Sequence, residues 1–456
     1  MNISVVILAA GEGSRMRSDQ PKILHALGGK PLLTHVVDAA QQLQPQIIHV
    51  VVGHKSELVR KNLAYLPVQW VEQTQQLGTG HAVAQAMPHL PQSGVVLVLY
   101  GDVPLINPTT LRNLIEQAKH SGLALVTAKL DNPTGYGRVV RDAAGRITRI
   151  VEEKDASPEI RAIGEINTGI LAANAEKLAK WLSGLQNDNA QSEYYLTDVI
   201  AAAVADGLSV ANVLPVTNSE ILGVNNRLQL AELERCFQAQ NAERLMLQGV
   251  TLLDPARFDQ RGTFNAGKDV TIDINVVLEG NVTCGDRVHI GPNTIIRNAK
   301  IGNDVRILAN CVIEDAVIGG GSRIGPFARI RPETVLAEDV HLGNFVEIKK
   351  TTVGRGTNIN HLSYIGDAQI GSGVNIGAGT ITCNYDGANK HRTIIGDGAF
   401  IGSDTQLVAP VEVGADATIG AGSTIARDVP PGGLTLSRVP QKTVPHWNRP
   451  QKKPKA

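Results

Sequence analysis

Residues 318–348 decide the fold of the C-terminal half, with the sequence IGGGSRIGPFARIRPETVLAEDVHLGNFVEI. An aliphatic residue opens each group of six in this stretch. The same spacing recurs in Val270, Val276, Val282, Val288 and Thr294, in Ile301, Ile307 and Ile313, in Val353, Ile359 and Ile365, in Ile370, Ile376 and Thr382, and in Ile395, Ile401, Leu407, Val413, Ile419 and Ile425. A unit this short must stack on its neighbours to form a continuous core. The period therefore predicts a parallel β-helix.

Glycine often follows the apolar residue, as in Ile324-Gly325, Ile376-Gly377 and Ile401-Gly402. We expect these glycines to occupy tight corners that require a positive φ. An ordinary sheet protein with regular turns is the alternative, but its strands would be longer and would alternate with a period of two. The six-residue period is lost between Thr382 and Ile395, so residues 383–390 are expected to form a loop that leaves the β-helix.

The N-terminal half has a different pattern, in which strand-like and helical stretches alternate. We expect strands at Val5–Ala9, Ile47–Val52, Val95–Tyr100 and Leu123–Lys129, and a helix at Leu32–Leu43. This order predicts an α/β domain with a mostly parallel sheet, whose ligands bind at the C-terminal ends of the strands. Asn226–Gln248 has helical apolar spacing and is followed by Gly249, so it is expected to be a linker helix. The predicted division is residues 1–227, 228–248 and 249–456, with a flexible tail from about residue 445.

Composition excludes several classes of protein. The 456 residues include 43 basic and 43 acidic side chains, which argues against a nucleic-acid surface covering the whole protein. The four cysteines show neither CxxC nor metal-like spacing, and the apolar N-terminal run is too short to span a membrane. We therefore expect a soluble, cytoplasmic protein. The Pro- and Lys-rich residues 449–456 leave a weak membrane or polyanion contact open.

Two loops that follow predicted strands suggest phosphate and metal chemistry. The first, Ala10–Met16, combines two glycines with Arg15, and Lys22 follows shortly after. It lacks both the Walker A sequence and the third glycine of a dinucleotide site, so by itself it is equally compatible with a structural turn. Asp102 ends a strand of apolar residues, where a carboxylate suits Mg²⁺ or simply caps a turn.

Further motifs establish a resemblance. LAAGEGSRM at residues 8–16, with Pro21-Lys22, resembles the signature of sugar-1-phosphate nucleotidyltransferases. The match is narrowed by QLGTGHA (76–82), YGDVP (100–104), GYGR (135–138), IVEEK (150–154), EINTG (165–169) and GVNN (223–226). Together with the hexapeptide half, these motifs resemble the bacterial bifunctional enzymes that make UDP-N-acetylglucosamine, a precursor of peptidoglycan and lipopolysaccharide. The resemblance covers essentially the whole chain and implies that the β-helix is left-handed.

For the N-terminal domain, the resemblance implies transfer of UMP from UTP to N-acetylglucosamine-1-phosphate with release of pyrophosphate. It places Mg²⁺ on Asp102 and Asn225. The implied nucleotide and sugar ligands are Leu8, Ala9, Ala10, Gly11, Arg15, Lys22, Gln73, Gly78, Thr79, Tyr100, Gly101, Asp102, Gly137, Glu152, Asn167 and Asn225. Without the resemblance, Glu152 would be interpreted as a solvated surface charge.

For the β-helix, the resemblance implies acetyl transfer from acetyl-CoA to glucosamine-1-phosphate, with His361 as the base and Glu347 orienting or tuning it. Arg331, Lys349, Tyr364 and Asn375 would bind the sugar phosphate, although charges on a solenoid also commonly face solvent. Acetyl-CoA would contact Ala378, Asn384, Tyr385, Ser403, Ala421 and Arg438. A homotrimer is implied, with acetyl sites between neighbouring β-helices. Cys383 is a conceivable nucleophile, but direct transfer with a histidine base needs none.

Two other interpretations stay open at this point. A nucleotidyltransferase with a regulatory β-helix, resembling ADP-glucose pyrophosphorylases, would not require His361 or the 383–390 loop. A scaffold that kept the fold without activity would be expected to lack Lys22, Asp102 or His361, and all three are present.

Overall fold

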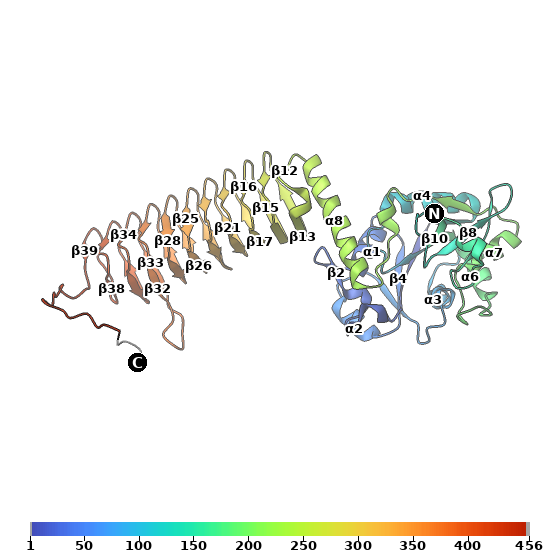
Figure 1. The fold of residues 1–456 in the computed structure, drawn as a ribbon, viewed down its shortest axis with the longest axis horizontal. Coiled ribbons are helices and arrows are strands. Elements are labelled where there is room, and N and C mark those ends of the chain that lie inside the picture. The colour runs from blue at the N-terminus through green and yellow to red at the C-terminus, as the bar shows by residue number, and fades with distance from the viewer. Residues whose placement is uncertain (1, 453–456) are drawn as a thin grey trace. The chain divides into compact units, whose positions relative to one another are not determined.

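The computed structural model describes residues 2–452 and divides the chain into two compact units, Met1–Phe237 and Gln238–Ala456. The division falls inside helix α8 (Arg227–Leu247), whose bounds differ by one residue at each end from the predicted linker helix (Figure 1). The functional boundaries 1–227, 228–248 and 249–456 stay a prediction. No helix within residues 2–452 is long and apolar enough to cross a membrane.

The first unit is built on a mixed sheet with the strand order β11-β7-β10-β6-β1-β4-β5. Its strands are β1 (Ile3–Ala9), β4 (Ile47–Val52), β5 (Gln69–Glu72), β6 (Val95–Tyr100), β7 (Leu123–Lys129), β10 (Glu165–Asn174) and β11 (Ala211–Val213). β10 runs antiparallel to β6 and β7, and the other pairs on this path are parallel. β10 also pairs with the hairpin β8 (Gly137–Arg141) and β9 (Ile147–Val151). The four predicted strands and the mostly parallel sheet are confirmed.

Helices cover both faces of this sheet. They are α1 (Leu32–Gln41), α2 (Ser56–Asn62), α3 (Thr79–Ala86), α4 (Pro108–Ser121), α5 (Pro158–Arg161), α6 (Ala175–Ser183) and α7 (Asp198–Ala205). Successive residues of β1 enter different cores: Val5 and Ile7 lie in one cluster, and Val6 and Leu8 in the other. A strand buried on both faces has no polar alternation, which is why β1 reads as a continuous apolar run.

The second unit is a parallel β-helix in which each regular coil contributes three short strands. One column contains β12 (Thr251–Leu252), β14 (Thr271–Ile272), β16 (His289–Ile290), β19 (Arg306–Ile307), β22 (Arg323–Ile324), β25 (His341–Asn344), β28 (Asn358–His361), β31 (Asn375–Ile376), β34 (Phe400–Ile401), β37 (Thr418–Ile419) and β39 (Leu434–Thr435). The second contains β17 (Ile295–Arg297), β20 (Val312–Glu314), β23 (Arg329–Ile330), β26 (Glu347–Lys349), β29 (Tyr364–Gly366), β32 (Ile381–Cys383), β35 (Gln406–Val408) and β38 (Thr424–Ile425). The third contains β18 (Lys300–Ile301), β21 (Ala316–Ile318), β24 (Thr334–Leu336), β27 (Thr352–Val353), β30 (Ala368–Ile370), β33 (Thr393–Ile395) and β36 (Val411–Val413). The long strands β13 (Phe258–Ala266) and β15 (Val276–Cys284) begin the last two columns.

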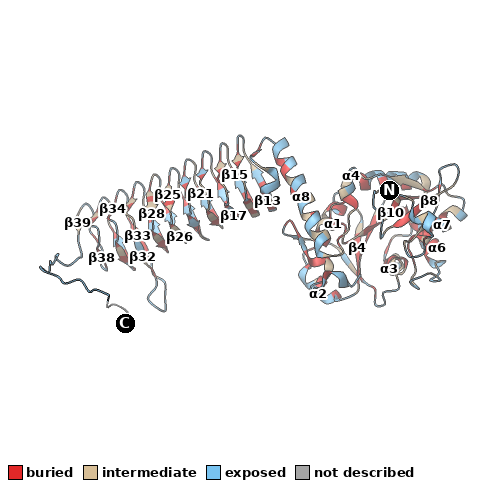
Figure 2. Cartoon of the chain, viewed as in Figure 1, coloured by how far each residue is buried: buried red, intermediate tan, exposed pale blue. Residues whose placement is uncertain are grey.

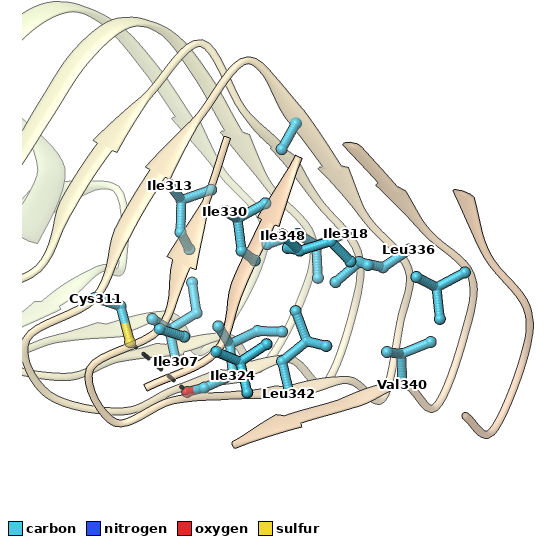
Figure 3. Close-up of a cluster of buried hydrophobic side chains, with 14 of the residues drawn as sticks. Ile307, Cys311, Ile313, Ile318, Ile324, Ile330, Leu336, Val340, Leu342 and Ile348 are labelled. Atoms are coloured by element: carbon cyan, nitrogen blue, oxygen red, sulfur yellow. Dashed lines mark hydrogen bonds between the residues drawn. The ribbon is translucent and has the colours of Figure 1, made fainter. Parts of the chain in front are cut away.

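The aliphatic residues at the six-residue period fill the interior of the β-helix (Figures 2 and 3). Ile318, Ile324, Ile330, Leu336, Leu342 and Ile348 are all at most 1% exposed. Each lies directly above or below its counterpart, because the register pairs Ile307 with Ile324 and Ile324 with Leu342. Burial of one branched side chain per strand therefore supplies the continuous core that the period predicts.

Of the three glycines expected to have a positive φ, only Gly325 does; the other two are required for a different reason. Gly325 has a positive φ of 89°, as predicted, but Gly377 and Gly402 do not have a positive φ. A Cβ on Gly377 would lie 2.5 Å from the backbone nitrogen of Ser403 in the next coil, and one on Gly402 would lie 2.5 Å from that of Ala421. At these two positions glycine is required by close backbone approach between coils.

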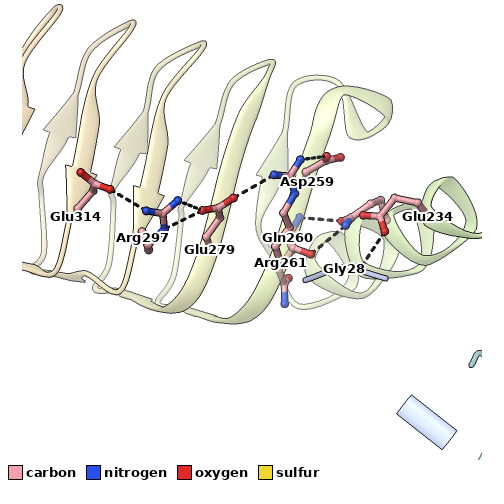
Figure 4. A network of polar contacts seen from close by, with 9 residues as sticks. Gly28, Glu234, Asp259, Gln260, Arg261, Glu279, Arg297 and Glu314 are labelled. Carbon is pink, nitrogen blue, oxygen red and sulfur yellow. Dashed lines mark hydrogen bonds and ion pairs between the residues drawn. The ribbon is translucent and has the colours of Figure 1, made fainter. Parts of the chain in front are cut away.

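Charged side chains also stack between coils on the outer surface. Glu279 accepts from Arg261 at 3.0 Å and from Arg297 at 2.5 Å, and Arg297 reaches Glu314 at 2.8 Å (Figure 4). These pairs are partly exposed, so each contributes little to stability. They follow the coil spacing without defining a site.

The C-terminal segment after β39 has no helix or strand within residues 436–452. The predicted tail from about residue 445 lies in this segment, and its last residues, 453–456, fall outside the described part of the chain. Its flexibility stays a prediction.

Candidate active sites

A cavity of about 310 Å³ opens at the C-terminal ends of β1, β5 and β6 in the first unit. It is lined by Leu8, Ala9, Ala10, Gly11, Lys22, Ile23, Gln73, Gln76, Gly78, Thr79, Ala82, Tyr100, Asp102 and Glu193. Parallel strands present their C-terminal loops at a common edge, which explains why residues so far apart in sequence meet here. Most of the residues expected to bind the nucleotide are among them.

A neighbouring cavity of about 250 Å³ shares Thr79, Tyr100 and Glu193 with the first. Its wall also includes Gly135, Tyr136, Gly137, Glu152, Asn167, Thr168, Gly169, Gln191, Tyr195 and Thr197. The three predicted residues Gly137, Glu152 and Asn167 therefore come together, on strands β8 and β10 and just after β9. The two cavities form adjoining halves of one site.

Positive charge concentrates at the edge of the first cavity. The Lys22 ammonium pairs with Oδ2 of Asp102 and lies 3.4 Å from Oδ1 of Asn225. Nη2 of Arg15 donates to the same Asn225 oxygen at 2.9 Å. The backbone N–H of Val224 donates to the carbonyl of Asp102 at 2.9 Å, which holds the 223–226 segment beside that strand end.

The predicted metal ligands fit a hard divalent cation. Asp102 and Asn225 offer a carboxylate and an amide oxygen, and both oxygens face the Lys22 ammonium. Mg²⁺ usually takes only one or two protein ligands together with phosphate oxygens of the substrate. Within residues 2–452 there is no cluster of three or more His, Cys, Asp or Glu side chains suited to hold a metal by themselves. The site therefore fits a cation that is shared with a triphosphate.

Gln73 and Gly78 belong to a glycine-rich loop that forms one wall of the first cavity. The buried Gln73 amide donates to the carbonyl of Gly78 at 3.1 Å and lies 2.9 Å from Nδ1 of His81. Gly78 has a φ of 105°, and a Cβ there would lie 2.7 Å from the carbonyl oxygen of Tyr194. Only glycine fits, so the loop that carries Thr79 is held in one conformation.

Glu152 is not a solvated surface charge. It lies partly buried in the wall of the second cavity, and Oγ1 of Thr197 donates to its carboxylate at 3.0 Å. Burial raises the pKa of Glu152, and the nearby carboxylate of Asp198 raises it further. A partly buried carboxylate in the cavity wall is suited to accept hydrogen bonds from a bound ligand.

In the second unit, the predicted base lies on a regular corner of the coils. Nδ1 of His361 lies 2.9 Å from Oδ1 of Asn344, its partner in the preceding coil. Because the amide oxygen can only accept, this contact places the ring proton on Nδ1 and leaves Nε2 free to accept another proton. The expected role of Glu347 is not supported by its contacts, since its carboxylate pairs with Arg331 at 2.7 Å.

Most residues expected to bind acetyl-CoA continue the same corner toward the C-terminus. Backbone hydrogen bonds link successive coils along this corner. The N–H of Gly379, which follows Ala378, donates to the carbonyl of His361 at 3.4 Å. In the same way the N–H of Asp404 donates to Ala378 at 2.7 Å, and that of Gly422 donates to Ser403 at 2.8 Å. Nη1 of Arg438 then donates to the carbonyl of Ala421 at 2.9 Å. The corner is thus a continuous column from His361 to Arg438.

A second group of predicted residues lies in the second strand column, with Arg331 just after β23, Lys349 on β26 and Tyr364 on β29. Arg331 and Lys349 stack in successive coils, because the N–H of Arg331 bonds to the carbonyl of Ile348. The next position in this column is Gly366, where a Cβ would lie 2.5 Å from the hydroxyl of Tyr364. Asn375 lies in the first strand column, on β31, whereas Tyr364 lies in the second, on β29.

Lys390 joins this basic group, although no pattern in the sequence singled it out. Contact with the Lys390 ammonium lowers the pKa of Lys349. The Asp367 carboxylate favours the charged form of both lysines and so offsets part of this repulsion. The position of Lys390 depends on how the 383–390 insertion folds. Because the six-residue period is lost there, the sequence does not show which residues of the coils Lys390 faces.

The insertion folds into a small hairpin closed by Asp386. Tyr385 bridges Lys390, and Asp386 accepts from the N–H groups of Ala388 and Asn389 at 2.8 and 2.6 Å. Its other oxygen lies 2.6 Å from Nε2 of His391. The backbone hydrogen bonds, with His391, hold the pKa of Asp386 well below its usual range. Burial raises the pKa of the Cys383 thiol, which disfavours the thiolate that a nucleophile would need.

The comparisons with known proteins agree with both halves. Residues 5–184 match the MobA-like NTP transferase domain, residues 261–353 the GMPPB C-terminal domain, and residues 392–427 the bacterial transferase hexapeptide (six repeats). A nucleotidyl transferase structure from Methanothermobacter thermautotroptrophicus is 22% identical and covers 53% of this chain and 99% of its own, with a TM-score of 0.39, which is too low to inform the site.

Two curated relatives match nearly the full chain. The bifunctional protein GlmU of Methylococcus capsulatus is 59% identical over 99% of this chain and 98% of its own length. The bifunctional protein GlmU of Azoarcus sp. is 57% identical over 99% of this chain and 100% of its own. The chain therefore belongs to the bifunctional GlmU family, in which a nucleotidyltransferase domain and a hexapeptide acetyltransferase domain serve the synthesis of UDP-N-acetylglucosamine.

Proposed function

We propose that the chain first acetylates glucosamine-1-phosphate in the β-helix and then transfers UMP from UTP to the product in the first unit. The observation that carries this proposal is the meeting of Lys22, Asp102 and Asn225 between a glycine-rich phosphate loop and a second, sugar-sized cavity. Such a site can hold two phosphorylated ligands end to end, which is the arrangement that nucleotidyl transfer requires.

For uridylyl transfer, a phosphate oxygen of the sugar attacks the α-phosphorus of UTP, and the bond to the β-phosphate breaks to release pyrophosphate. Arg15 and Lys22 supply positive charge beside the glycine-rich loop. Gln73 and Gly78 support the base-binding loop, and Glu152 and Asn167 line the sugar cavity. Asp102 and Asn225 would hold Mg²⁺, which neutralises phosphate charge when bound.

For acetyl transfer, the sugar amine attacks the acetyl carbonyl, the carbon–sulfur bond breaks and CoA leaves as a thiol. Nε2 of His361 accepts the proton that the amine loses, while Asn344 holds the opposite ring nitrogen. Arg331, Lys349 and Lys390 bind the sugar phosphate. Acetyl-CoA would contact the column that runs from Ala378 to Arg438, and also Asn384 and Tyr385 of the insertion.

A homotrimer and a cytoplasmic location belong to the same proposal. The hexapeptide β-helix and the GlmU relatives support the trimer, in which the acetyl-transfer sites would lie between neighbouring β-helices. Sedimentation equilibrium tests this directly, and a monomer with full acetyl transfer would contradict it. The four free cysteines within the described residues are compatible with a reducing compartment.

The two half-reactions are tested separately in purified protein. Pyrophosphate release should require both UTP and N-acetylglucosamine-1-phosphate, and CoA release should require glucosamine-1-phosphate. Pyrophosphate release without any CoA release would instead favour a nucleotidyltransferase with a regulatory β-helix. Neither release under these conditions would contradict both assignments.

A further inference from the structure

The segment Glu152–Asp155, which follows β9, makes more contacts than the proposed chemistry uses. Its four side chains reach different parts of the domain: Glu152 the hydroxyl of Thr197 (3.0 Å), Glu153 the guanidinium of Arg138 (2.7 Å), Lys154 Oε1 of Gln191 (2.6 Å), and Asp155 the backbone N–H of Ala190 (3.0 Å). Only Glu152 has a role in the proposed function. The contact between Glu153 and Arg138 is the most deeply buried of the remaining three.

Arg138 is a buried cation on strand β8, and its side chain is 2% exposed. Its guanidinium forms an ion pair with Glu153 and donates hydrogen bonds to the carbonyl of Tyr136 and, at 3.3 Å, to the carbonyl of Arg161. A buried charge is tolerated only when it is paired and hydrogen-bonded, so these contacts fix the guanidinium in one place. The planar, branched shape of arginine permits all three at once, which a lysine ammonium on a single stem would not reproduce.

The partners of Arg138 are next to the residues that line the sugar cavity. Tyr136 and Gly137 lie in that wall, and Glu153 follows Glu152. The two segments also meet directly, because a Cβ on Gly137 would lie 3.3 Å from Oε2 of Glu152. A shift of the Arg138 guanidinium would therefore move the part of the cavity wall that Gly137 and Glu152 form.

We propose that Arg138 is a positioning residue for the sugar-phosphate substrate, acting through Glu153 and the Tyr136 carbonyl to hold Glu152 and Gly137 in place. This inference rests on the proposed uridylyl transfer and adds a residue that determines the fit of the sugar. It predicts a selective defect, because Tyr136, whose carbonyl accepts from Arg138, lines the second cavity together with Gly137 and Glu152, and none of these three lines the first cavity. Binding of UTP should be nearly unaffected.

The test compares Arg138→Lys and Glu153→Gln with the control Arg141→Lys. Arg141 lies on the same strand and forms a two-pronged pair with Glu165 at 2.8 and 2.7 Å, but it does not line either cavity. In both test variants we expect KM for N-acetylglucosamine-1-phosphate to rise about tenfold and KM for UTP to change less than about twofold. The control should change neither, and acetyl transfer should stay normal in all three.

Thermal unfolding of each variant separates positioning from simple stability. Glu153→Gln keeps the shape of the side chain, so it remains informative if Arg138→Lys folds poorly. Unchanged KM for the sugar phosphate in Glu153→Gln, or an equal rise in both KM values, would overturn the proposal. Wild-type protein that releases no pyrophosphate from UTP and the sugar phosphate would instead refute the proposed function.

Discussion

Nδ1 of His361 lies 2.9 Å from Oδ1 of Asn344, one coil away in the β-helix. The pairing fixes both the orientation of the ring and the nitrogen that carries its proton. A general base must present a free lone pair to its substrate, and this pairing leaves that lone pair on Nε2 of His361.

His361→Ala should lower kcat for acetyl transfer by about 10²–10⁴-fold, which is the usual contribution of a positioned general base. Asn344→Ala should give a smaller loss, since the imidazole remains but is free to rotate or change tautomer. Initial-rate assays of CoA release measure both effects. If acetyl transfer in His361→Ala equals that of the wild type, His361 is not the base.

Asp102→Ala should abolish pyrophosphate release and leave CoA release nearly unchanged. The carboxylate of Asp102 is a predicted metal ligand and the partner of Lys22, whereas acetyl transfer is assigned to the other compact unit. Binding of Mn²⁺ in the presence of UTP, followed by electron paramagnetic resonance, should weaken in parallel. Loss of both activities to the same degree would contradict independent sites.

Glu152→Gln should stabilise the free protein at neutral pH while weakening the binding of the sugar phosphate. Because burial raises the pKa of Glu152 in the fold, its charged form destabilises the folded state at any pH above that raised pKa. The stabilisation by Gln should therefore shrink as the pH falls through the folded pKa toward the ordinary glutamate value. Thermal unfolding from pH 7 to pH 4 measures the trend, and a stabilisation that grows on acidification would contradict it.

Asp386→Asn should raise KM for acetyl-CoA with little effect on uridylyl transfer. The carboxylate closes the inserted hairpin that carries Tyr385 and Lys390, and asparagine would replace the carboxylate contact with Nε2 of His391 while keeping one acceptor oxygen. The pKa of Asp386 is lowered, so the wild-type contact persists down to acidic pH and is lost only as the pH falls through that lowered value. KM values for acetyl-CoA at pH 7.5 decide the point, with His391→Gln expected to behave similarly.

Gly402→Ala should destabilise the β-helix more than Gly356→Ala. A Cβ at residue 402 would lie 2.5 Å from a backbone nitrogen of the next coil. A Cβ at residue 356 would have open space around it, with no described atom within 4 Å apart from those of the adjacent residues in the chain. Gly356 has a positive φ of 69°, so alanine there should cost about 1–2 kcal/mol. The thermal midpoint for loss of acetyl transfer compares the two variants, and equal midpoints would show that the coils can separate locally at little cost.

The sequence predicted those parts of the molecule in which a local pattern has one structural solution. Aliphatic residues spaced six apart can all be buried together only if the short repeats stack into a β-helix. The apolar runs of β1, β4, β6 and β7 lack the regular alternation of polar residues that a strand with one face in solvent would show. The clustering of the nucleotide loops follows from the parallel sheet. The pairing of Glu347 with Arg331 was not predictable, because it depends on which side chains face each other in successive coils.

Other features depended on three-dimensional context that a linear motif does not contain. Lys390 approaches Lys349 only because the insertion folds back as a hairpin, in a coil that spans 25 residues where neighbouring coils span 17 or 18. The partial burial of Glu152 arises from Thr197 and the surrounding acidic side chains, which come from distant segments. Likewise, the need for glycine at residue 402 comes from the adjacent coil.

Mass spectrometry of the products formed from glucosamine-1-phosphate, acetyl-CoA, UTP and Mg²⁺ tests the central claim most directly. The account predicts UDP-N-acetylglucosamine from the wild-type chain and accumulation of N-acetylglucosamine-1-phosphate in Asp102→Ala. His361→Ala should form far less of both compounds than the wild-type chain over the same time. Absence of any acetylated product from the wild-type chain would contradict the assignment of the β-helix as an acetyltransferase.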